Sequence, residues 1–419
     1  MKKEAVVIGS GISGLSIAQI LSDKYEVKVL ERSGKVGGLV KCDRINGNLF
    51  HRVGGHVFNS KNSEVLDWFW KQFDRDAEFL QATRNAKILI NDKIIGYPIE
   101  NYLYQLPDNE IRTIVTELLG ILKAGAKPVS EYKNFKEFLI GNFGNELYNL
   151  YFGPYNTKIW NTDISKVPLD WLEGKLPMPR IEDVILSNII KKEETNMVHS
   201  KFYYPKRDGS QFIVDRLSQS LNITCDYVVS SITSSEGKLC INDTLQTDAM
   251  VYCGDVRQLH KLVNIEDEAL KAALNAVIEL PSNGTSNVLC ETDDNDISWL
   301  YLPEEKFKAH RIIYTGNFSD TNNEGTDRKT CVVEFSGKHD REEMLKELEL
   351  LPGNLKALEF NYEPNSYIIQ QPDTRNKIDT LKKLLAKYNI YLLGRFAEWE
   401  YYNMDKAIES AMALSKLVE

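Results

Sequence analysis

Apolar and polar positions near the start of the chain follow two different periods. The apolar run at residues 5–8 is rich in β-branched side chains, and a glycine-rich turn at 9–14 follows it. Helical spacing then holds from 15 to 21, and a second apolar run, 27–30, ends in an acidic residue. This order predicts a strand, a tight turn, a helix and a second strand.

The pattern becomes helical in the second quarter of the chain. Segments of helical spacing, rich in aromatic residues, lie at 111–124, 135–143 and 146–152. A stretch punctuated by proline follows them. We expect a helical insertion in this part of the chain.

Short strand-like runs dominate from about residue 200 to 385, separated by turns rich in Asn, Asp and Gly. These runs are 226–231, 249–253, 298–302, 311–315 and 330–335. Their spacing favours an antiparallel sheet. A last strand at 390–394 and an amphipathic helix at 404–417 predict a return to the first domain, which would close a doubly wound sheet.

The turn GSGISG has the spacing of a dinucleotide-binding fingerprint, and the strand after it ends in Glu31. Glycines there allow the backbone to approach a pyrophosphate at the helix N-terminus, while the acid accepts ribose hydroxyls. A second glycine pair shortly after the acid favours FAD over a simple NAD dehydrogenase. The cofactor-binding residues predicted in this segment are Gly9, Gly11, Ile12, Ser13, Gly14, Glu31, Arg32, Gly37, Gly38 and Leu39.

Length and composition limit the function further. The 419 residues exceed the roughly 250 to 300 at which a single core stops growing, so more than one domain is expected. A formal net charge of −9 disfavours a broad nucleic-acid surface. Six scattered cysteines without a CxxC pair predict neither a disulfide framework nor a metal site, and favour the cytoplasm. No apolar stretch reaches the roughly 20 residues that span a membrane.

Three further features carry candidate chemistry, each with a simpler structural alternative. The sequence GGH at 54–56 allows close approach to a planar ligand, or forms a turn with a satisfied histidine. The aromatic and cationic residues around Tyr155 and Trp160 form a stacking platform beside phosphates, or part of a core. Arg311, in the strand-like run RIIYTG, points into a cleft or lies on an exposed edge.

Taken in order, the blocks RVGGHVF, GYPIENY, GPYNTKIW, WLYLPEEKFKAHR and LLGRFAEWEYYNMDKAIESAM resemble UDP-galactopyranose mutases. The resemblance runs through most of the chain. The N-terminal glycine segment is shared with amine oxidases and protoporphyrinogen oxidases, so it does not discriminate among these flavoproteins. The later blocks do discriminate, most of all the C-terminal block and the GGH block.

The resemblance implies an α/β fold: a Rossmann-like FAD-binding domain with a helical insertion and an antiparallel β-sheet substrate domain. The expected FAD-binding parts are residues 1–95 and 386–419. A helical substrate-side domain is expected over 96–197, and a mixed segment with the antiparallel sheet over 198–385.

The implied activity is a flavin-dependent isomerisation of UDP-galactopyranose to UDP-galactofuranose, or of a related nucleotide sugar, for cell-surface polysaccharide. In this family N5 of reduced FAD attacks the anomeric carbon, with no net redox change. The expected partners are a UDP-sugar and a reductant, either NAD(P)H or a reductase, and homo-oligomerisation stays open. One alternative is an FAD-dependent oxidoreductase of the amine oxidase or protoporphyrinogen oxidase type. Another is a flavin-binding protein without catalysis, which would explain the altered Glu100 and Lys175.

The resemblance also assigns roles to individual residues. The catalytic residues it implies are His56, Arg311, Lys175 and Arg180. The substrate-binding residues are Tyr97, Tyr155, Asn156, Trp160, Tyr367 and Tyr401. Further cofactor-binding residues are Gly54, Gly55, Val228, Gly394, Arg395, Tyr401 and Met404. Lys175 stands where a second diphosphate arginine is expected, and Arg180 is the other candidate for that role. Glu100 and Gly153 also depart from the family pattern, in place of a glutamine and an arginine.

Overall fold

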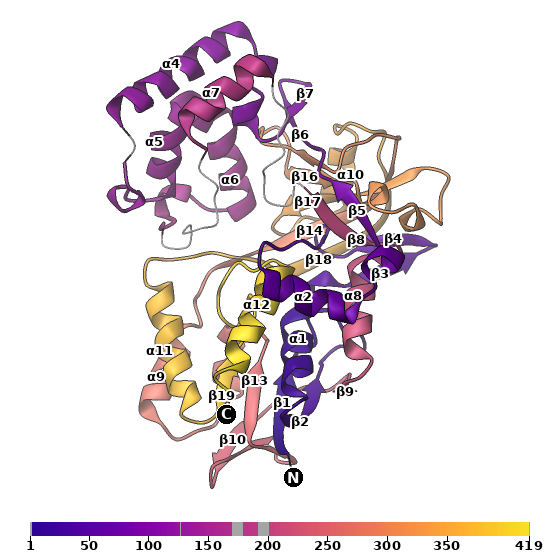
Figure 1. Cartoon of the computed structure of the whole chain (residues 1–419), viewed down its shortest axis with the longest axis vertical. Helices are drawn as coiled ribbons and strands as arrows, with labels where there is room; N and C mark the ends of the chain where they lie inside the picture. The colour runs from indigo at the N-terminus through magenta and orange to yellow at the C-terminus, as the bar shows by residue number, and fades with distance from the viewer. Residues whose placement is uncertain (1, 126, 170–178, 192–200, 419) are drawn as a thin grey trace.

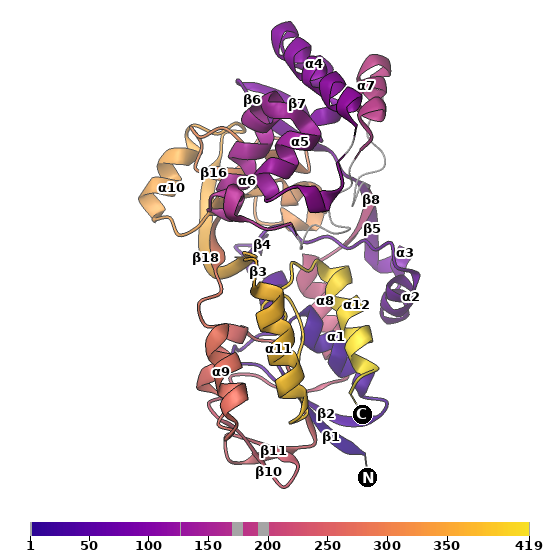
Figure 2. The same ribbon diagram turned by 90° about the vertical axis from the view of Figure 1, so that its left-hand side faces the viewer.

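The structure, a computed structural model, describes residues 2–125, 127–169, 179–191 and 201–418. Three groups of elements follow one another along the long axis of the molecule (Figures 1 and 2). A parallel sheet with its helices lies at the end that holds both termini, a larger sheet lies in the middle, and a group of helices lies at the far end. The predicted fold class, α/β with a Rossmann-like domain and an antiparallel sheet, is confirmed.

The terminal group is built on a five-stranded parallel sheet in the order β19-β13-β1-β2-β9. Its strands are β1 (Lys3–Ile8), β2 (Tyr25–Leu30), β9 (Asn222–Thr224), β13 (Ala249–Tyr252) and β19 (Ile390–Leu392). Strand β1 pairs on one side with β2, the next strand of this sheet along the chain, and on the other side with β13, which comes much later. The strand order therefore reverses at β1, and its carboxyl end is the topological switch point where ligands bind. The predicted return of the C-terminus is confirmed, because β19 pairs in parallel with β13.

Both faces of this sheet are covered, which explains its apolar strands. Helices α1 (Ile12–Leu21) and α12 (Met404–Ser415) pack against each other beside it (Figure 1). A second apolar cluster joins the parallel sheet to helices α9 (Glu268–Ala276) and α11 (Thr374–Ala386) and to a small antiparallel sheet. The strands of that small sheet are β10 (Ile232–Ser235), β11 (Lys238–Ile241) and β12 (Leu245–Thr247).

The strand predicted at 226–231 is wrong, since β10 begins only at Ile232. The Asn242 side chain occupies the backbone groups that a sheet would use. Its Oδ1 accepts from the amides of Ser230 at 2.7 Å and Ser231 at 3.2 Å, and its amide donates to the Val228 carbonyl at 2.9 Å. The segment is therefore a loop held by one side chain.

The middle group is a seven-stranded sheet in the order β18-β14-β17-β16-β15-β6-β7. Its strands are β6 (Ala86–Ile90), β7 (Lys93–Gly96), β14 (Ser282–Thr292), β15 (Trp299–Tyr301), β16 (Ala309–Ile313), β17 (Lys329–Ser336) and β18 (Lys356–Ile368). All neighbours are antiparallel except β15 and β6. Helix α10 (Arg341–Leu348) packs on it. The pair β6–β7 belongs to this sheet, although the domain division predicted from sequence placed it in the first domain.

The helical group joins the rest of the chain through two paired strands. Strand β5 (Phe79–Thr83) leads into it and β8 (Lys201–Pro205) leads out, and the two pair antiparallel. Its helices are α4 (Asp108–Ala124), α5 (Phe135–Leu147), a π-helical turn (Tyr148–Phe152), α6 (Gly153–Trp160) and α7 (Ile181–Ile190). No helix in the described ranges is both long enough and apolar enough to cross a membrane.

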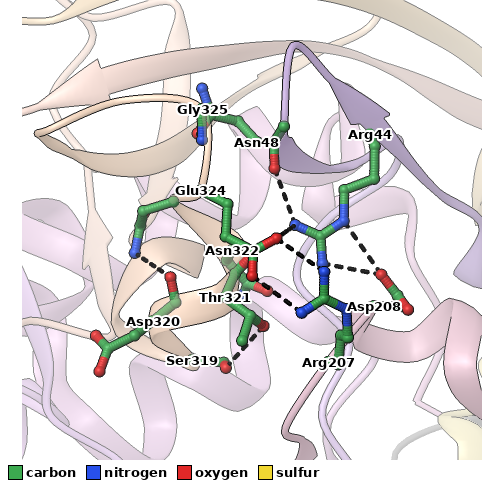
Figure 3. A network of polar contacts seen from close by, with 12 residues as sticks. Arg44, Asn48, Arg207, Asp208, Ser319, Asp320, Thr321, Asn322, Glu324 and Gly325 are labelled. Atoms are coloured by element: carbon green, nitrogen blue, oxygen red, sulfur yellow. Dashed lines mark hydrogen bonds and ion pairs between the residues drawn. The ribbon is translucent and has the colours of Figure 1, made fainter.

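A polar network joins the segment between β16 and β17 of the seven-stranded sheet to the part of the chain around β3 (Cys42–Ile45), β4 (Asn48–His51) and α8 (Gly209–Ser218) (Figure 3). It involves the hairpin of β3 and β4, the residues before α8, and the segment 319–325. Arg44 donates to Asp208 and to the Thr321 carbonyl, and Arg207 pairs with Glu324 through two bonds of 3.0 Å. Helix α2 (Ser63–Gln72) packs in one apolar cluster with α1 and α12, and the short helix α3 (Arg75–Glu78) follows it.

Candidate active site

Two glycine turns contact each other at the carboxyl end of β1. The first turn has no room for a side chain at Gly14, because a Cβ there would lie 2.0 Å from the Gly9 carbonyl oxygen. The second turn touches it, since a Cβ at Gly38 would lie 3.2 Å from the Gly11 Cα. The Gly37 amide also donates to the Ser10 carbonyl at 2.9 Å. The turn at residues 9–14 and the pair Gly37-Gly38 therefore lie against each other, and we name this assembly the cradle.

Glu31 ends β2 beside the cradle. Its carboxylate accepts from the amide and hydroxyl of Ser10 at 2.9 and 2.6 Å, and from those of Ser33 at 2.9 and 2.8 Å. Burial raises the pKa of this carboxyl, but the four donors outweigh burial and leave the pKa below its usual value. The group is an ionised acceptor held in one place.

Arg311 lies on β16 and faces Glu334 across the ladder to β17, where the two are register partners. Its Nη2 donates to both Glu334 oxygens at 2.9 and 3.0 Å and contacts the Tyr367 hydroxyl at 3.1 Å. That hydroxyl donates to Glu334 at 2.9 Å. Burial lowers the pKa of Arg311, but Glu334 more than offsets this and holds it well above the ordinary value. Within the described ranges, the buried Nε of Arg311 has no hydrogen-bond partner.

Aromatic rings surround this cation. Tyr367 and Tyr401 stack with centroids 5.9 Å apart and planes 6° apart. Trp160, at the end of α6, meets each of them edge-on at 6.2 Å. Tyr155, one turn earlier in α6, is buried edge-on to Tyr301 at 5.3 Å. The structure therefore brings four predicted substrate residues and Arg311 together from four separate segments of the chain.

His56 connects the cradle with this aromatic cluster. Its Nε2 lies 3.1 Å from the Leu39 carbonyl, which can only accept, so Nε2 carries the hydrogen. Gly54 packs against the ion pair, since a Cβ there would lie 3.4 Å from Arg311 Nη2. Burial, with added repulsion from Arg395, lowers the pKa of His56 to about 4. The imidazole is neutral at physiological pH.

The C-terminal block closes the other side of the cradle. Gly394 has φ 101°, and a Cβ there would lie 2.8 Å from the Ser13 hydroxyl. Arg395 donates to the carbonyls of Ser366 and Tyr402 and lies 4.5 Å from the Tyr401 ring centroid. Met404 is buried at the start of α12, in the same apolar cluster as Ile12.

Other predicted residues lie less centrally. Tyr97 stacks on Tyr301 at 4.7 Å, with the Arg84 guanidinium over its ring. Asn156 donates to the Phe152 carbonyl at 2.8 Å, within its own helix. Arg32 and Val228 are exposed at the edge of the cradle side.

Of the two candidates for a second diphosphate cation, Arg180 and Lys175, the structure describes only Arg180. Arg180 precedes α7, is mostly exposed and pairs with Glu182 and Asp183 of that helix. The structure does not bring it into the Arg311 cluster. Lys175 lies outside the described residues.

Gly153, the departure at the start of α6, has a local explanation. A Cβ there would lie 2.8 Å from the Tyr148 ring and 2.9 Å from the Tyr148 carbonyl. The π-helical turn therefore requires glycine, and an arginine does not fit. For Glu100, the structure shows its carbonyl accepting from the Asn188 amide at 2.7 Å.

Sequence reasoning missed Glu334, His310, Tyr301 and Arg84. Glu334 is the central omission, because it is almost fully buried and holds Arg311. Burial raises its pKa, but the Arg311 guanidinium outweighs burial and leaves the pKa far below the usual range. A usable signal was present: two neighbouring strand-like runs each carry a charge of opposite sign among apolar residues.

The glycine cradle, the switch point and the cluster beside them define an α/β protein with a Rossmann-like dinucleotide-binding domain. The NAD(P)-binding Rossmann-like domain family matches residues 7–73.

Similarity to known proteins narrows this class. The chain is 21% identical to the UDP-galactopyranose mutase of Mycoplasma genitalium over 443 aligned positions, covering 97% of this chain and 92% of that protein. A second alignment, 26% identical over 185 residues, matches the Klebsiella pneumoniae protein described as "Probable UDP-galactopyranose mutase". It covers 42% of this chain and only 45% of that protein.

The crystal structure of reduced UDP-galactopyranose mutase matches with a TM-score of 0.87 at 18% identity, covering 100% of this chain and 94% of the other. At this identity the match shows a shared fold. The resemblance to UDP-galactopyranose mutases is thus confirmed along nearly the full chain, and a mutase-type function is supported.

Proposed function

We propose that this protein is a flavin-dependent isomerase that interconverts UDP-galactopyranose and UDP-galactofuranose, or a related nucleotide-sugar pair. The observation that carries the proposal is a partly buried arginine, Arg311, enclosed by aromatic rings and adjoining a dinucleotide cradle. Among the described residues, its buried Nε has no hydrogen-bond partner. An oxidase acting on an apolar substrate would need no such cation in this position.

The cradle fits FAD. Its glycines leave backbone exposed at the N-terminus of α1, where the partial positive charge of the helix favours a pyrophosphate. Glu31 is an ionised acceptor at the place where ribose hydroxyls are bound in this fold. The proposed contacts to the flavin ring come from Gly54, Gly55, Gly394, Arg395 and Met404. When bound in the reduced form, FAD supplies the nucleophile for the anomeric carbon.

Arg311 serves as the diphosphate cation in this proposal. Its Nη2 is fixed by Glu334 and Tyr367, so the guanidinium is oriented before the substrate arrives. The remaining donors are free to bind phosphate oxygens and to stabilise charge as it moves onto the leaving diphosphate. Pre-orientation avoids an entropic cost at the moment of reaction.

Neutral groups complete the proposed site. Tyr401 stacks on Tyr367 and presents a hydroxyl as a donor, while Tyr155 and Trp160 form the wall against which the nucleotide lies. With its hydrogen on Nε2, His56 has an acceptor at Nδ1 that can orient a substrate hydroxyl or a flavin N–H. Tyr97 and Asn156 are assigned to the uracil side on the resemblance alone.

The test is direct interconversion. The protein is purified with its flavin, reduced with dithionite, mixed with UDP-galactose or UDP-galactofuranose, and the products are separated by chromatography. We expect interconversion with the reduced protein and none with the oxidised protein. If the reduced protein interconverts none of the UDP-hexoses and dTDP-hexoses tried, the proposal is wrong.

The same preparation tests the alternative. Oxygen consumption by the oxidised protein with an amine or a porphyrinogen would establish the oxidoreductase reading instead. Replacing dithionite with NADH or NADPH shows whether the protein accepts its own reductant or needs a reductase. The polysaccharide role and the cytoplasmic location stay predictions.

A further inference from the structure

His310 is a buried histidine that the proposed function does not use. It precedes Arg311 on β16 and has no solvent exposure. Its Nε2 lies 2.9 Å from Glu334 Oε1. In the part of the chain that the structure describes, however, neither ring nitrogen makes a hydrogen bond of good geometry. The imidazole is thus within reach of the carboxylate that holds Arg311, but it is not used as a donor.

The charges around His310 are balanced without a proton on its ring. Arg311, beside it on β16, is neutralised by Glu334 of β17. From α6, the Lys158 ammonium donates to the carbonyls of Leu302 and Glu304 at 2.7 Å and opposes a charge on His310. Burial lowers the pKa of His310 further, against the opposite effect of Glu334. The imidazole is neutral while the site holds no anion.

The other titratable groups around the ring are phenols. Tyr155 of α6 and Tyr367 of β18 each lie 6.4 Å from it, centroid to centroid. Burial keeps the pKa of both far above the ordinary value, so both are neutral. In the described ranges, Glu334 and Arg311 are therefore the charges that His310 meets most closely.

A diphosphate at Arg311 changes this balance. A nucleotide sugar adds one negative charge on each of two phosphates, and Arg311 is then shared between the ligand and Glu334. Uncompensated negative charge in a buried site costs several kcal/mol, on the order seen when one member of a buried pair is removed. A proton on His310 would restore the balance and give Glu334 a second charged donor at 2.9 Å.

We infer that His310 takes up a proton from solvent when a nucleotide sugar binds at Arg311, and releases it when the ligand leaves. The inference rests on the proposed function, because it needs a diphosphate at that arginine. Only the proton moves: it comes from the buffer, joins a ring nitrogen of His310, and no other bond forms or breaks.

Calorimetric titration of the flavin-containing protein with UDP-galactose tests this coupling. The diphosphate of this probe is a diester that does not titrate near neutral pH, so uptake belongs to the protein. We expect the observed binding enthalpy near pH 7 to differ between two buffers of unequal ionisation enthalpy. Affinity should fall as pH rises, by up to about tenfold per pH unit.

Two variants locate the proton. His310→Gln keeps a donor of similar size but cannot titrate, so the buffer dependence should disappear. His339→Gln changes a histidine that pairs with Glu343 on the far side of β17, and it should keep the wild-type buffer dependence. Thermal melting and flavin content check that both variants fold.

The outcomes separate the inference from the proposed function, and every titration is repeated with the UDP-hexoses and dTDP-hexoses of the interconversion assay before absence of binding is concluded. If the wild-type protein gives equal binding enthalpies in both buffers, the inference is overturned, whether or not the His310→Gln variant folds. Undiminished buffer dependence in folded His310→Gln also overturns it. Proton uptake without interconversion leaves the inference standing and defeats the mutase proposal, whereas no binding of any of these nucleotide sugars in any buffer defeats both.

Discussion

The cradle and the Arg311 cluster adjoin each other but are built in opposite ways. The cradle comes mostly from one short stretch of chain, and it is specified by what its residues lack, since almost any side chain at Gly14 collides with backbone. The Arg311 cluster is specified by what its residues carry. Its charges and rings come from β16, β17, β18, α6 and the loop before α12.

The difference shows how each region tolerates change. A side chain added to the backbone cradle blocks the ligand by steric exclusion. Removing one member of a buried ion pair leaves the other charge uncompensated and destabilises the fold. Removing the pair's acid should therefore harm the whole fold, whereas a well-chosen change in the cradle should remove the cofactor and spare the fold. The following predictions test this contrast, from the largest expected effect to the smallest.

Glu334→Ala should have the largest effect on stability. It leaves Arg311 buried without its counter-ion, and breaking a buried pair costs about 3–5 kcal/mol. Urea denaturation measures the loss. Glu342→Ala, which removes an exposed partner of Lys346, is the matched control and should cost at most about 1 kcal/mol. Similar losses in the two variants would contradict the buried-pair account.

Acid should destabilise the fold through histidines that burial keeps neutral. Burial lowers the pKa of His51 to about 3 and that of His56 to about 4, both below the unfolded value of 6.5. Their contribution is therefore complete above pH 6.5 and is lost as the pH falls toward these folded values. The free energy of unfolding should drop by about 1.4 kcal/mol per pH unit for each histidine. Denaturation at a series of pH values would show no such slope if these groups were solvated.

Arg311→Lys should weaken nucleotide-sugar binding while keeping the charge that Glu334 needs. A lysine lacks the planar fork, so it cannot hold Glu334 and a phosphate together. Losing a charge-assisted hydrogen bond costs about 1.5 to 3 kcal/mol, or roughly ten- to a hundredfold in affinity. Titration with UDP-galactose measures it, and wild-type affinity would remove Arg311 from the diphosphate site.

Gly11→Val should empty the cradle without unfolding it. A Cβ at Gly11 has only ordinary contacts, 3.8 Å from the Gly38 Cα, so stability should change by less than about 1 kcal/mol. The valine occupies space that a pyrophosphate needs. Flavin absorbance per protein should fall several-fold, while Gly120→Ala, on an open face of α4, keeps full flavin. A Gly11→Val protein with full flavin would refute the cradle assignment.

Arg180→Ala should have the smallest effect. The side chain is exposed and its ion pairs lie on its own helix, so stability should change by no more than about 0.5 kcal/mol. Affinity for UDP-galactose should stay within about twofold, which corresponds to the same free energy. A loss like that of Arg311→Lys would show that Arg180 reaches the ligand after all.

The cradle was predictable because the residues that specify it lie close together in the sequence. Strand, turn, helix and acid fall within about thirty residues, and each step follows from periodicity or from glycine. Strand β14 was not predictable in the same way. Its first half, SNGTSN, is polar, yet nearly all of it is buried between β17 and β18, where side-chain hydrogen bonds such as Thr285 to Ser366 satisfy it.

The Arg311 cluster was predictable only in part. The strands that carry Arg311 and Glu334 were expected, but their pairing depends on the register of β16 against β17, which tertiary contacts determine. Without that register, the charge at Arg311 could equally have been an exposed edge residue. The family resemblance supplied the role of Arg311. The opposite charges in two neighbouring strand-like runs were a signal for Glu334, but no pattern pointed to His310.

The pairing of β5 with β8 has a consequence for how such proteins diversify. Strand β5 ends at Thr83 and β8 begins at Lys201, and these two residues are cross-strand neighbours. The ends of the intervening segment are therefore only about 5 Å apart. This segment first gives β6 and β7 to the seven-stranded sheet. The helical part that follows β7 can then lengthen, shorten or be exchanged without displacing the strands that frame it. Duplication and drift can then alter the helical wall around a ligand while the nucleotide-holding half is inherited unchanged.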